Sequence, residues 1–167
     1  MSAAEGRSEG RTGGEAPRIL VSACLLGHPV RFDGGAKPCA STILARWVAE
    51  GWVVPVCPEQ AGGLDTPRPP GELQPDGRVR TADGTDLTEA FLKGAQATLD
   101  LAQRTGAVLA ILKEGSPSCG SGFVHDGTFR GRRRPGQGMT ASLLRAHGIP
   151  VFSEEALEAA QAWLEAH

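Results

Sequence analysis

Long hydrophobic runs are missing from this sequence, and no apolar stretch approaches the about 20 residues that would span a bilayer. An excess of charge of one sign is missing as well. The net charge of -2 gives no general attraction to nucleic acid or to an acidic membrane surface. We therefore expect a soluble protein that has neither a membrane nor a nucleic acid as its partner.

The first residues lack the apolar core of a secretory signal. Residues 1–17 are small, polar and rich in glycine, so we predict a disordered N-terminal tail. A cytoplasmic location follows from this interpretation. In that compartment the four cysteines are expected to be free thiols or metal ligands rather than disulfides.

Residues 18–167 are enough for a single domain with a full hydrophobic core. Short apolar runs typical of strands covered on both faces alternate with helical patterns. The runs are 19–23, 52–56, 107–112 and 149–152, and the helical patterns are 41–51, 86–106, 138–147 and a last one from 153. This alternation predicts an α/β fold of three layers, Rossmann-like, with a mainly parallel sheet of about four to five strands and helices on both faces.

One segment interrupts the alternation. Residues 62–85 are rich in Gly, Pro and Asp and contain one weak strand pattern, near 78–81. We interpret them as a long surface excursion with room for a small hairpin, and such loops are usually functional or mobile. Arg68 within it either points at a substrate carbonyl or pins the loop.

Three of the four cysteines follow predicted strands. Cys24 follows the first strand, Cys57 the second, and Cys119 the third, after a Gly-Ser-Pro-Ser turn. The carboxyl ends of parallel strands lie at one edge of the sheet, where open α/β sheets bind ligands. Thiols that are 33 and 62 residues apart in the sequence are therefore expected to converge.

Three converging thiolates favour a soft metal, although each cysteine alone reads equally well as a small buried apolar residue. Zinc would take a fourth protein ligand or a water. An iron–sulfur cluster held by three thiolates would keep one iron open, since full ligation takes four. Cys39, beside the start of the first helix, is an incidental thiol, a reactive one or a fourth ligand.

Five segments carry a family resemblance. They are SACLLGHPVRFDGG at 22–35, VPVCPEQAGGLDTPRPPGEL at 54–73, DGTDLTEAFLKGA at 83–95, ILKEGSPSCG at 111–120 and GQGMTASLLRAHGIPVFSEE at 136–155. In this order and spacing they resemble the thiouracil desulfidase family over about residues 18–165. The CPE and SPSCG motifs are the most specific marks of the resemblance.

The resemblance implies a [4Fe-4S] cluster held by Cys24, Cys57 and Cys119, with the fourth iron free. It implies that this iron binds the thiocarbonyl sulfur of a small-molecule thiolated pyrimidine. The implied reaction is non-redox, and it converts 2-thiouracil to uracil and sulfide. Relatives that act on tRNA carry additional RNA-binding domains, and this sequence shows none.

The resemblance also places Glu59 and Ser116 at catalytic positions, whereas Cys39 matches no ligand. Glu59 could act as a general base toward water, and Ser116 could orient the ring or relay a proton. From the residues alone, Glu59 reads as a helix cap or a salt-bridge partner. Ser116 reads as a turn hydroxyl, and Ser118 is a weaker candidate for the same work.

Two further features have alternative interpretations. Four arginines lie within residues 130–134, and such a run is usually a solvated loop, although the following Gly-rich turn could hold a phosphate. His28 and His125 are expected at the surface, with lining of a pocket as the alternative.

The function class also has an alternative, which is a non-catalytic metal- or cluster-binding, redox-sensing module that uses Cys39 as fourth ligand.

Overall fold

The structure is a computed structural model that describes residues 16–167, so the predicted tail lies almost wholly outside the described residues. The helices are α1 (Thr42–Ala49), α2 (Pro58–Ala61), α3 (Thr88–Thr105), α4 (Met139–Ala146) and α5 (Leu157–Ala166), with short 3-10 helices η1 (Ala23–Leu26) and η2 (Glu154–Ala156). None of the helices in residues 16–167 is long and apolar enough to cross a membrane.

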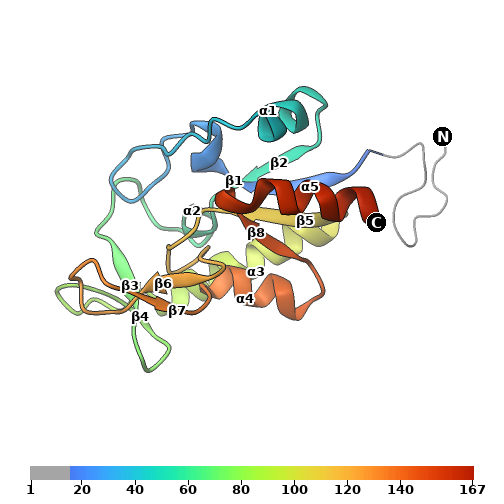
Figure 1. Ribbon diagram of the computed structural model, residues 1–167. Coiled ribbons are helices and arrows are strands. Elements are labelled where there is room, and N and C mark those ends of the chain that lie inside the picture. The colour runs from blue at the N-terminus through green and yellow to red at the C-terminus, as the bar shows by residue number, and fades with distance from the viewer. Residues whose placement is uncertain (1–15) are drawn as a thin grey trace.

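A parallel sheet of four strands forms the centre of the molecule, in the order β2-β1-β5-β8 (Figure 1). These strands are β1 (Arg18–Ser22), β2 (Val53–Val56), β5 (Ala107–Leu112) and β8 (Val151–Ser153). Each lies within two residues of its predicted apolar run. The predicted α/β fold with a parallel sheet is thus confirmed.

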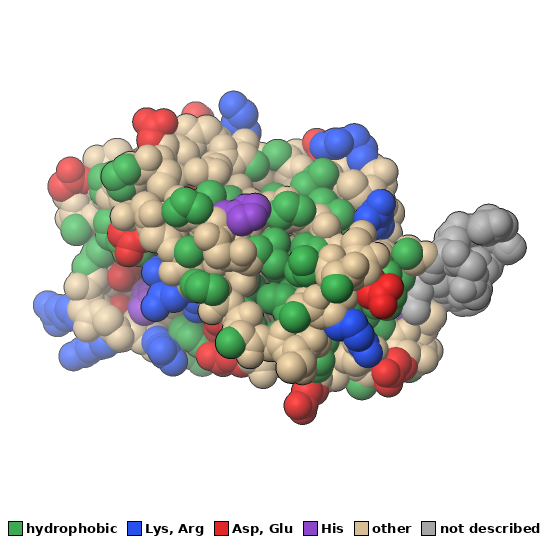
Figure 2. All heavy atoms as spheres, turned by 90° about the horizontal axis from the view of Figure 1, so that it is seen from above, with side chains coloured by type: hydrophobic (Ala, Val, Ile, Leu, Met, Phe, Trp, Pro, Cys, Tyr) green, Lys and Arg blue, Asp and Glu red, His purple; other side chains and the backbone are tan. Residues whose placement is uncertain are grey.

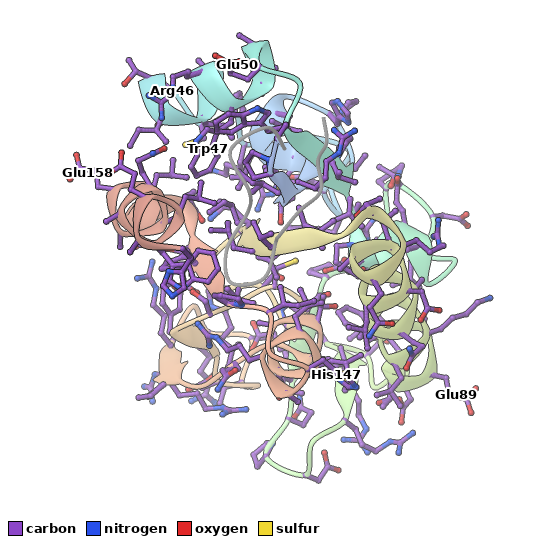
Figure 3. All side chains as sticks on the ribbon, turned by 90° about the vertical axis from the view of Figure 1, so that its right-hand side faces the viewer. Arg46, Trp47, Glu50, Glu89, His147 and Glu158 are labelled. Atoms are coloured by element: carbon purple, nitrogen blue, oxygen red, sulfur yellow. The ribbon has the colours of Figure 1, made fainter. Side chains whose placement is uncertain are left out.

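Helices cover both faces of this sheet, as the end-on view shows (Figure 3). Alternate residues of β1 and β5 point to opposite faces, and each set is buried in its own core. One core joins Ile19, Val21, Leu109 and Ile111 to α1 and α5, and the other joins Leu20, Ala110 and Leu112 to α3 and α4. The chain changes faces between β1 and β5, so the edge beside these two strands is the point where such folds bind ligands.

Two hairpins extend beyond the carboxyl ends of the strands (Figure 1). β3 (Gly71–Leu73) pairs with β4 (Val79–Thr81), and β6 (Phe123–His125) pairs with β7 (Arg133–Pro135), both antiparallel. The first hairpin contains the weak strand expected within residues 62–85. The second was not expected, because residues 130–134 had been interpreted as a loop, and here Arg133 and Arg134 belong to β7.

The long helix begins later than its sequence pattern predicts. The pattern begins at residue 86, whereas the residue at the N-cap position is Leu87, which has no side-chain cap. Asp86 instead accepts a hydrogen bond from the N–H of Thr88 over 2.8 Å. The N–H of Leu87 donates to the carbonyl of Val79, 2.8 Å away. This hydrogen bond to β4 keeps Leu87 outside the helix, which begins at Thr88.

Candidate metal centre and active site

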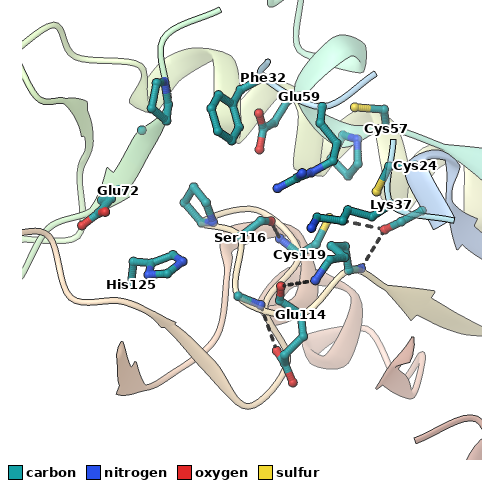
Figure 4. Close-up of a pocket in the computed structure, with 18 of the residues that line it drawn as sticks. Cys24, Phe32, Lys37, Cys57, Glu59, Glu72, Glu114, Ser116, Cys119 and His125 are labelled. Atoms are coloured by element: carbon teal, nitrogen blue, oxygen red, sulfur yellow. Dashed lines mark hydrogen bonds between the residues drawn. The ribbon is translucent and has the colours of Figure 1, made fainter. Parts of the chain in front are cut away.

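The three strand-end cysteines line one cavity of about 630 Å³ at the carboxyl edge of the sheet. Cys24 lies in η1 directly after β1, Cys57 is the residue that precedes α2, and Cys119 lies in the turn after β5. All three are free thiols, and Figure 4 shows them gathered on one side of the cavity. The structure thus confirms the prediction that the three cysteines converge.

Burial determines the acidity of two of these thiols. It raises the pKa of Cys24, and it raises the pKa of Cys119 to about 12. The hydroxyl of Ser22 donates toward Cys119 Sγ over 3.7 Å and opposes this effect only in part. A thiol with so high a pKa keeps its proton near neutral pH unless a metal replaces it.

Cys39 lies elsewhere. Its N–H donates to the carbonyl of Leu25 over 2.9 Å, and its side chain packs against the core under α1 and α5. It is not among the residues that line the cavity. The geometry therefore gives the cavity three thiols.

Close contact between α2 and α3 fixes the position of Cys57 and Glu59. A Cβ atom added at Gly94 of α3 would lie 1.9 Å from the carbonyl oxygen of Pro58, and one added at Gly62 would lie 2.0 Å from the carbonyl oxygen of Ala90. The two backbones can approach this closely only because both positions lack a side chain. The CPE segment is thereby packed directly onto the long helix.

Glu59 points into the cavity and is paired with Arg68 (Figure 4). Its Oε1 accepts a hydrogen bond from Nε of Arg68 at 2.9 Å, and Nη2 of Arg68 forms a salt bridge with the same oxygen at 2.8 Å. Nη2 also donates to the carbonyl of Val30, and Nη1 donates to the carbonyl of Asp65. Arg68 therefore pins its loop, as one of the two interpretations held, and Glu59 is the salt-bridge partner that the residues alone suggested.

Ser116 lines the cavity, whereas Ser118 does not. The Ser116 hydroxyl oxygen accepts from the N–H groups of Ser118 and Cys119, at 3.2 and 2.7 Å. It thus shapes the turn that carries Cys119, and its own hydrogen is left for another acceptor. Ser118 is buried, and its hydroxyl forms a hydrogen bond with the hydroxyl of Thr140 at 2.9 Å. Ser118 therefore has a structural role.

The start of α4 supports the same turn. The N–H groups of Met139 and Thr140 donate to the carbonyls of Pro117 and Ser118, each over 2.9 Å. A Cβ at Gly138 would lie 2.4 Å from the carbonyl carbon of Ser118, so only glycine allows this approach. The suggested phosphate site at this helix start is therefore wrong, because the turn already occupies its donors.

The arginine run is divided between surface and interior. Figure 2 shows Lys and Arg side chains at the end of the molecule where the hairpins lie. Arg130, Arg132 and Arg133 are exposed, and Arg134 is half-buried. The guanidinium of Arg133 lies 4.3 Å from the centre of the Phe123 ring, and Nε of Arg134 is buried. The prediction of a wholly solvated loop is wrong, because half of the run pairs as strand β7.

Residues of the two hairpins complete the cavity, and sequence reasoning missed most of them. Glu72, Phe129 and His125 line it. The expected surface position is right for the exposed His28 and wrong for His125. The Asp-Gly turn signal at residues 126–127 marks this hairpin, but its pairing with β3 depends on residues more than fifty positions away.

Comparisons with known proteins agree with this geometry. Residues 19–156 match the model of the family described as 2-thiouracil desulfurase. The uncharacterized protein YbbK of Bacillus subtilis (strain 168) is 43% identical over 148 residues, which cover 83% of this chain and 97% of that protein. A solved structure described as a [4Fe-4S]-dependent thiouracil desulfidase, TudS, is 49% identical and has a TM-score of 0.88.

That structural similarity covers 90% of this chain and 99% of the TudS chain. The family match spans both the CPE and the SPSCG motifs, which carry the resemblance seen in the sequence. The class of the protein as a desulfidase enzyme follows from these matches. The chain belongs to the 2-thiouracil desulfurase family.

Proposed function

We propose that this protein removes sulfur from a thiolated pyrimidine by hydrolysis, converting 2-thiouracil and water to uracil and hydrogen sulfide. The observation that carries the proposal is the cavity in which three free thiols from three strand ends face the carboxylate of Glu59. The similar TudS structure is described as dependent on a [4Fe-4S] cluster, and we assign such a cluster to Cys24, Cys57 and Cys119 here.

The donor set fits this cofactor. No group of three or more His, Cys, Asp or Glu side chains within residues 16–167 is arranged to hold a single metal ion. In a [4Fe-4S] cluster each thiolate binds a different iron, so thiols that line one cavity without meeting at a single ion suit a cluster better than one zinc ion. When bound through three thiolates, the cluster supplies an open iron that acts as a Lewis acid for the thiocarbonyl sulfur.

Glu59 then acts on water. Arg68 engages Oε1 through the Nε hydrogen bond and the salt bridge, and this fixes the direction of the carboxylate. Oε2 is left to accept a proton from a water molecule as that water attacks the ring carbon. Water supplies the new carbonyl oxygen of uracil and both hydrogens of the hydrogen sulfide. The overall reaction therefore needs no oxidant or reductant.

Ser116 contributes a hydroxyl group to the same cavity as Glu59. Its oxygen is fixed by two backbone donors, so the hydroxyl is held in place before the substrate arrives. We assign it to orient the pyrimidine ring or to relay the proton that reaches the leaving sulfur. The cytoplasmic location predicted from the first residues suits a centre of reduced thiols.

The alternative function, a closed metal- or cluster-binding module, needs a fourth protein ligand. Cys39 was the candidate for that place, and it packs under α1 and α5 rather than in the cavity. A centre with only three thiols leaves a coordination position for a substrate. The geometry therefore favours the enzyme.

Glu59→Gln tests the proposal, with Glu158→Gln as the matched control on the exposed side of α5 (Figure 3). Uracil and sulfide release from 2-thiouracil are measured on protein prepared without oxygen, together with iron per chain. We expect Glu59→Gln to keep its iron and to lose about a hundredfold or more in kcat. A Glu59→Gln variant that works at the rate of the control would contradict the assigned base.

A further inference from the structure

One wall of the cavity has no assigned role in the proposed desulfuration. Strand β3 and the β6–β7 hairpin contribute Glu72, Phe123, His125 and Phe129 to it, and we call these four residues the hairpin wall. Figure 4 shows Glu72 and His125 across the cavity from the three cysteines. A ligand whose sulfur meets the thiol side would therefore present its opposite edge to the hairpin wall.

His125 is unusual in its hydrogen bonding. Its Nδ1 is buried and makes no hydrogen bond with any of the described residues. Buried polar atoms in proteins are nearly always paired, so the unpaired Nδ1 restricts which form of the ring is stable. The imidazole ring points from β6 into the cavity (Figure 4), where its edge can meet a ligand.

The unpaired Nδ1 also indicates the tautomer. A buried N–H group without an acceptor is rarer in proteins than an acceptor without a donor. We therefore assign the ring hydrogen to Nε2 and leave Nδ1 as the unpaired acceptor. In that form His125 offers an N–H donor to the cavity.

Phe129 is held in an unfavourable backbone conformation. It is the one residue other than glycine with a positive φ in residues 16–167, at 60°. Bulky residues rarely adopt this conformation, and such strain persists where the surrounding structure enforces it. Here Oε1 of Glu72 accepts from the N–H of Phe129 at 3.1 Å and from that of Gly127 at 2.9 Å.

A second contact reinforces this clamp. Nε2 of Gln74, the residue after β3, donates to the carbonyl of Gly127 over 3.2 Å, so the turn is held through both a donor and an acceptor. The result is an aromatic ring fixed in the wall of the cavity at the expense of backbone strain. A turn that served only to connect β6 and β7 would place glycine at this position.

We propose that the hairpin wall recognises the pyrimidine ring, with His125 as the specificity-determining residue. His125 donates from Nε2 to the remaining carbonyl oxygen of 2-thiouracil, and Phe129 packs against the ring. Glu72 acts through Phe129 as a positioning residue. This inference rests on the proposed function, because it assigns the substrate edge that lies away from the thiocarbonyl group.

The first test replaces His125 in protein that carries its iron. His125→Leu removes the donor, whereas His125→Gln places an amide N–H near the position of Nε2. We expect His125→Leu to raise KM for 2-thiouracil and to weaken uracil binding in calorimetry, each about tenfold, with kcat largely unchanged. His125→Gln should retain most of the affinity, and His28→Leu, at an exposed histidine, should retain all of it.

The second test separates recognition from folding. Phe129→Gly removes the ring and also relieves the strain, because glycine accepts a positive φ without penalty. We expect the melting temperature to stay equal or rise, whereas the affinity for uracil falls. A stability loss with unchanged uracil binding would show that Phe129 serves the fold alone, and would overturn its part in recognition.

The outcomes distinguish this inference from the proposed function. Absence of both turnover and uracil binding in the iron-loaded wild-type protein would remove the function and the inference together. Normal turnover in the wild type, with unchanged KM and uracil affinity in both His125→Leu and Phe129→Gly, would overturn the inference alone. Weaker uracil binding in both variants at full iron content supports it.

Discussion

At the scale of single residues, burial and position distinguish the four cysteines from one another. Cys24, Cys57 and Cys119 line the cavity, whereas Cys39 packs against the core under α1 and α5 without lining the cavity. A pKa of about 12 makes the Cys119 thiol a poor nucleophile in the metal-free protein. Binding to iron, as we propose, would replace that proton.

Replacement of each cysteine by serine tests this division. Cys24→Ser, Cys57→Ser and Cys119→Ser should each lose most of the bound iron, because a hydroxyl does not replace a thiolate ligand. Cys39→Ser is the matched control and should keep both iron and turnover. The measurement is iron per chain with the absorption of the cluster. Iron loss in Cys39→Ser equal to that in the other three would contradict the three-ligand centre.

The residues of the site could be predicted from sequence only in part. The cysteines follow apolar strands, so a rule about strand ends brings them together, and the family resemblance adds Glu59 and Ser116. His125 and Glu72 gave no such signal. Their places depend on contacts between two hairpins, such as that from Gly127 to Glu72, and local patterns carry no information on those contacts.

At the scale of elements, Glu114 organises the turn that carries Ser116 and Cys119. Its carboxylate accepts from the N–H groups of Gly115, Ser121 and Gly122 and from the Ser121 hydroxyl. Burial works to raise the pKa of Glu114, but these hydrogen bonds outweigh it and hold the pKa below its usual 4.5. The ionised form is therefore stabilised by folding.

A pH dependence of stability follows from that lowered pKa. The contribution of Glu114 is fully present above pH 4.5 and is lost as the pH falls through the lower folded-state value, because the folded state then has to take up the proton. We expect Glu114→Gln to cost on the order of 1 kcal/mol at pH 7, since solvent screens part of the interaction.

Urea unfolding at pH 7 and at pH 3 to 4 measures this effect in the wild type and in Glu114→Gln. The stability difference between the two proteins should shrink on acidification. A difference that stays constant or grows toward low pH would contradict the assignment of the effect to the Glu114 carboxylate.

The contact between α2 and α3 gives a second prediction for an element. Gly94→Ala places a methyl group against the Pro58 carbonyl, which moves α2 and with it Cys57 and Glu59. We expect a loss of about 1 to 3 kcal/mol in the free energy of unfolding, despite the higher helix propensity of alanine. Gln96→Ala, at an exposed position of the same helix, is the control and should leave stability nearly unchanged.

Iron content adds a readout to this comparison. Gly94→Ala should bind less iron than Gln96→Ala, since Cys57 leads directly into α2. Equal stability and equal iron content in the two variants would contradict the claim that the α2–α3 contact positions Cys57 and Glu59.

The elements themselves were predictable to different degrees. The four sheet strands and the starts of α1 and α4 follow from apolar runs and from capping signals such as Ser41, which accepts from the N–H groups of Ile43 and Leu44. α2 is only one turn long, and its place depends on α3 rather than on its own sequence. β7 was hidden because three consecutive arginines do not resemble a strand.

At the scale of the whole molecule, the two cores lie under helix pairs on opposite faces of the sheet. The cavity lies at the edge beyond them, where the loops after β1, β2 and β5 meet the two hairpins (Figures 1 and 4). Cys24 and Cys119 belong both to the cores and to the cavity lining, but the sheet and its helices pack through apolar side chains. Protein without iron should retain the sheet and its helices and should lose activity.

The central claim is that three thiols hold a [4Fe-4S] cluster with one iron open to substrate. It is tested most directly by the iron and acid-labile sulfide per chain in protein prepared without oxygen. We expect about four of each. Zinc in place of iron, or no metal even after reconstitution with iron and sulfide, would contradict the claim and remove the reactive centre from this account.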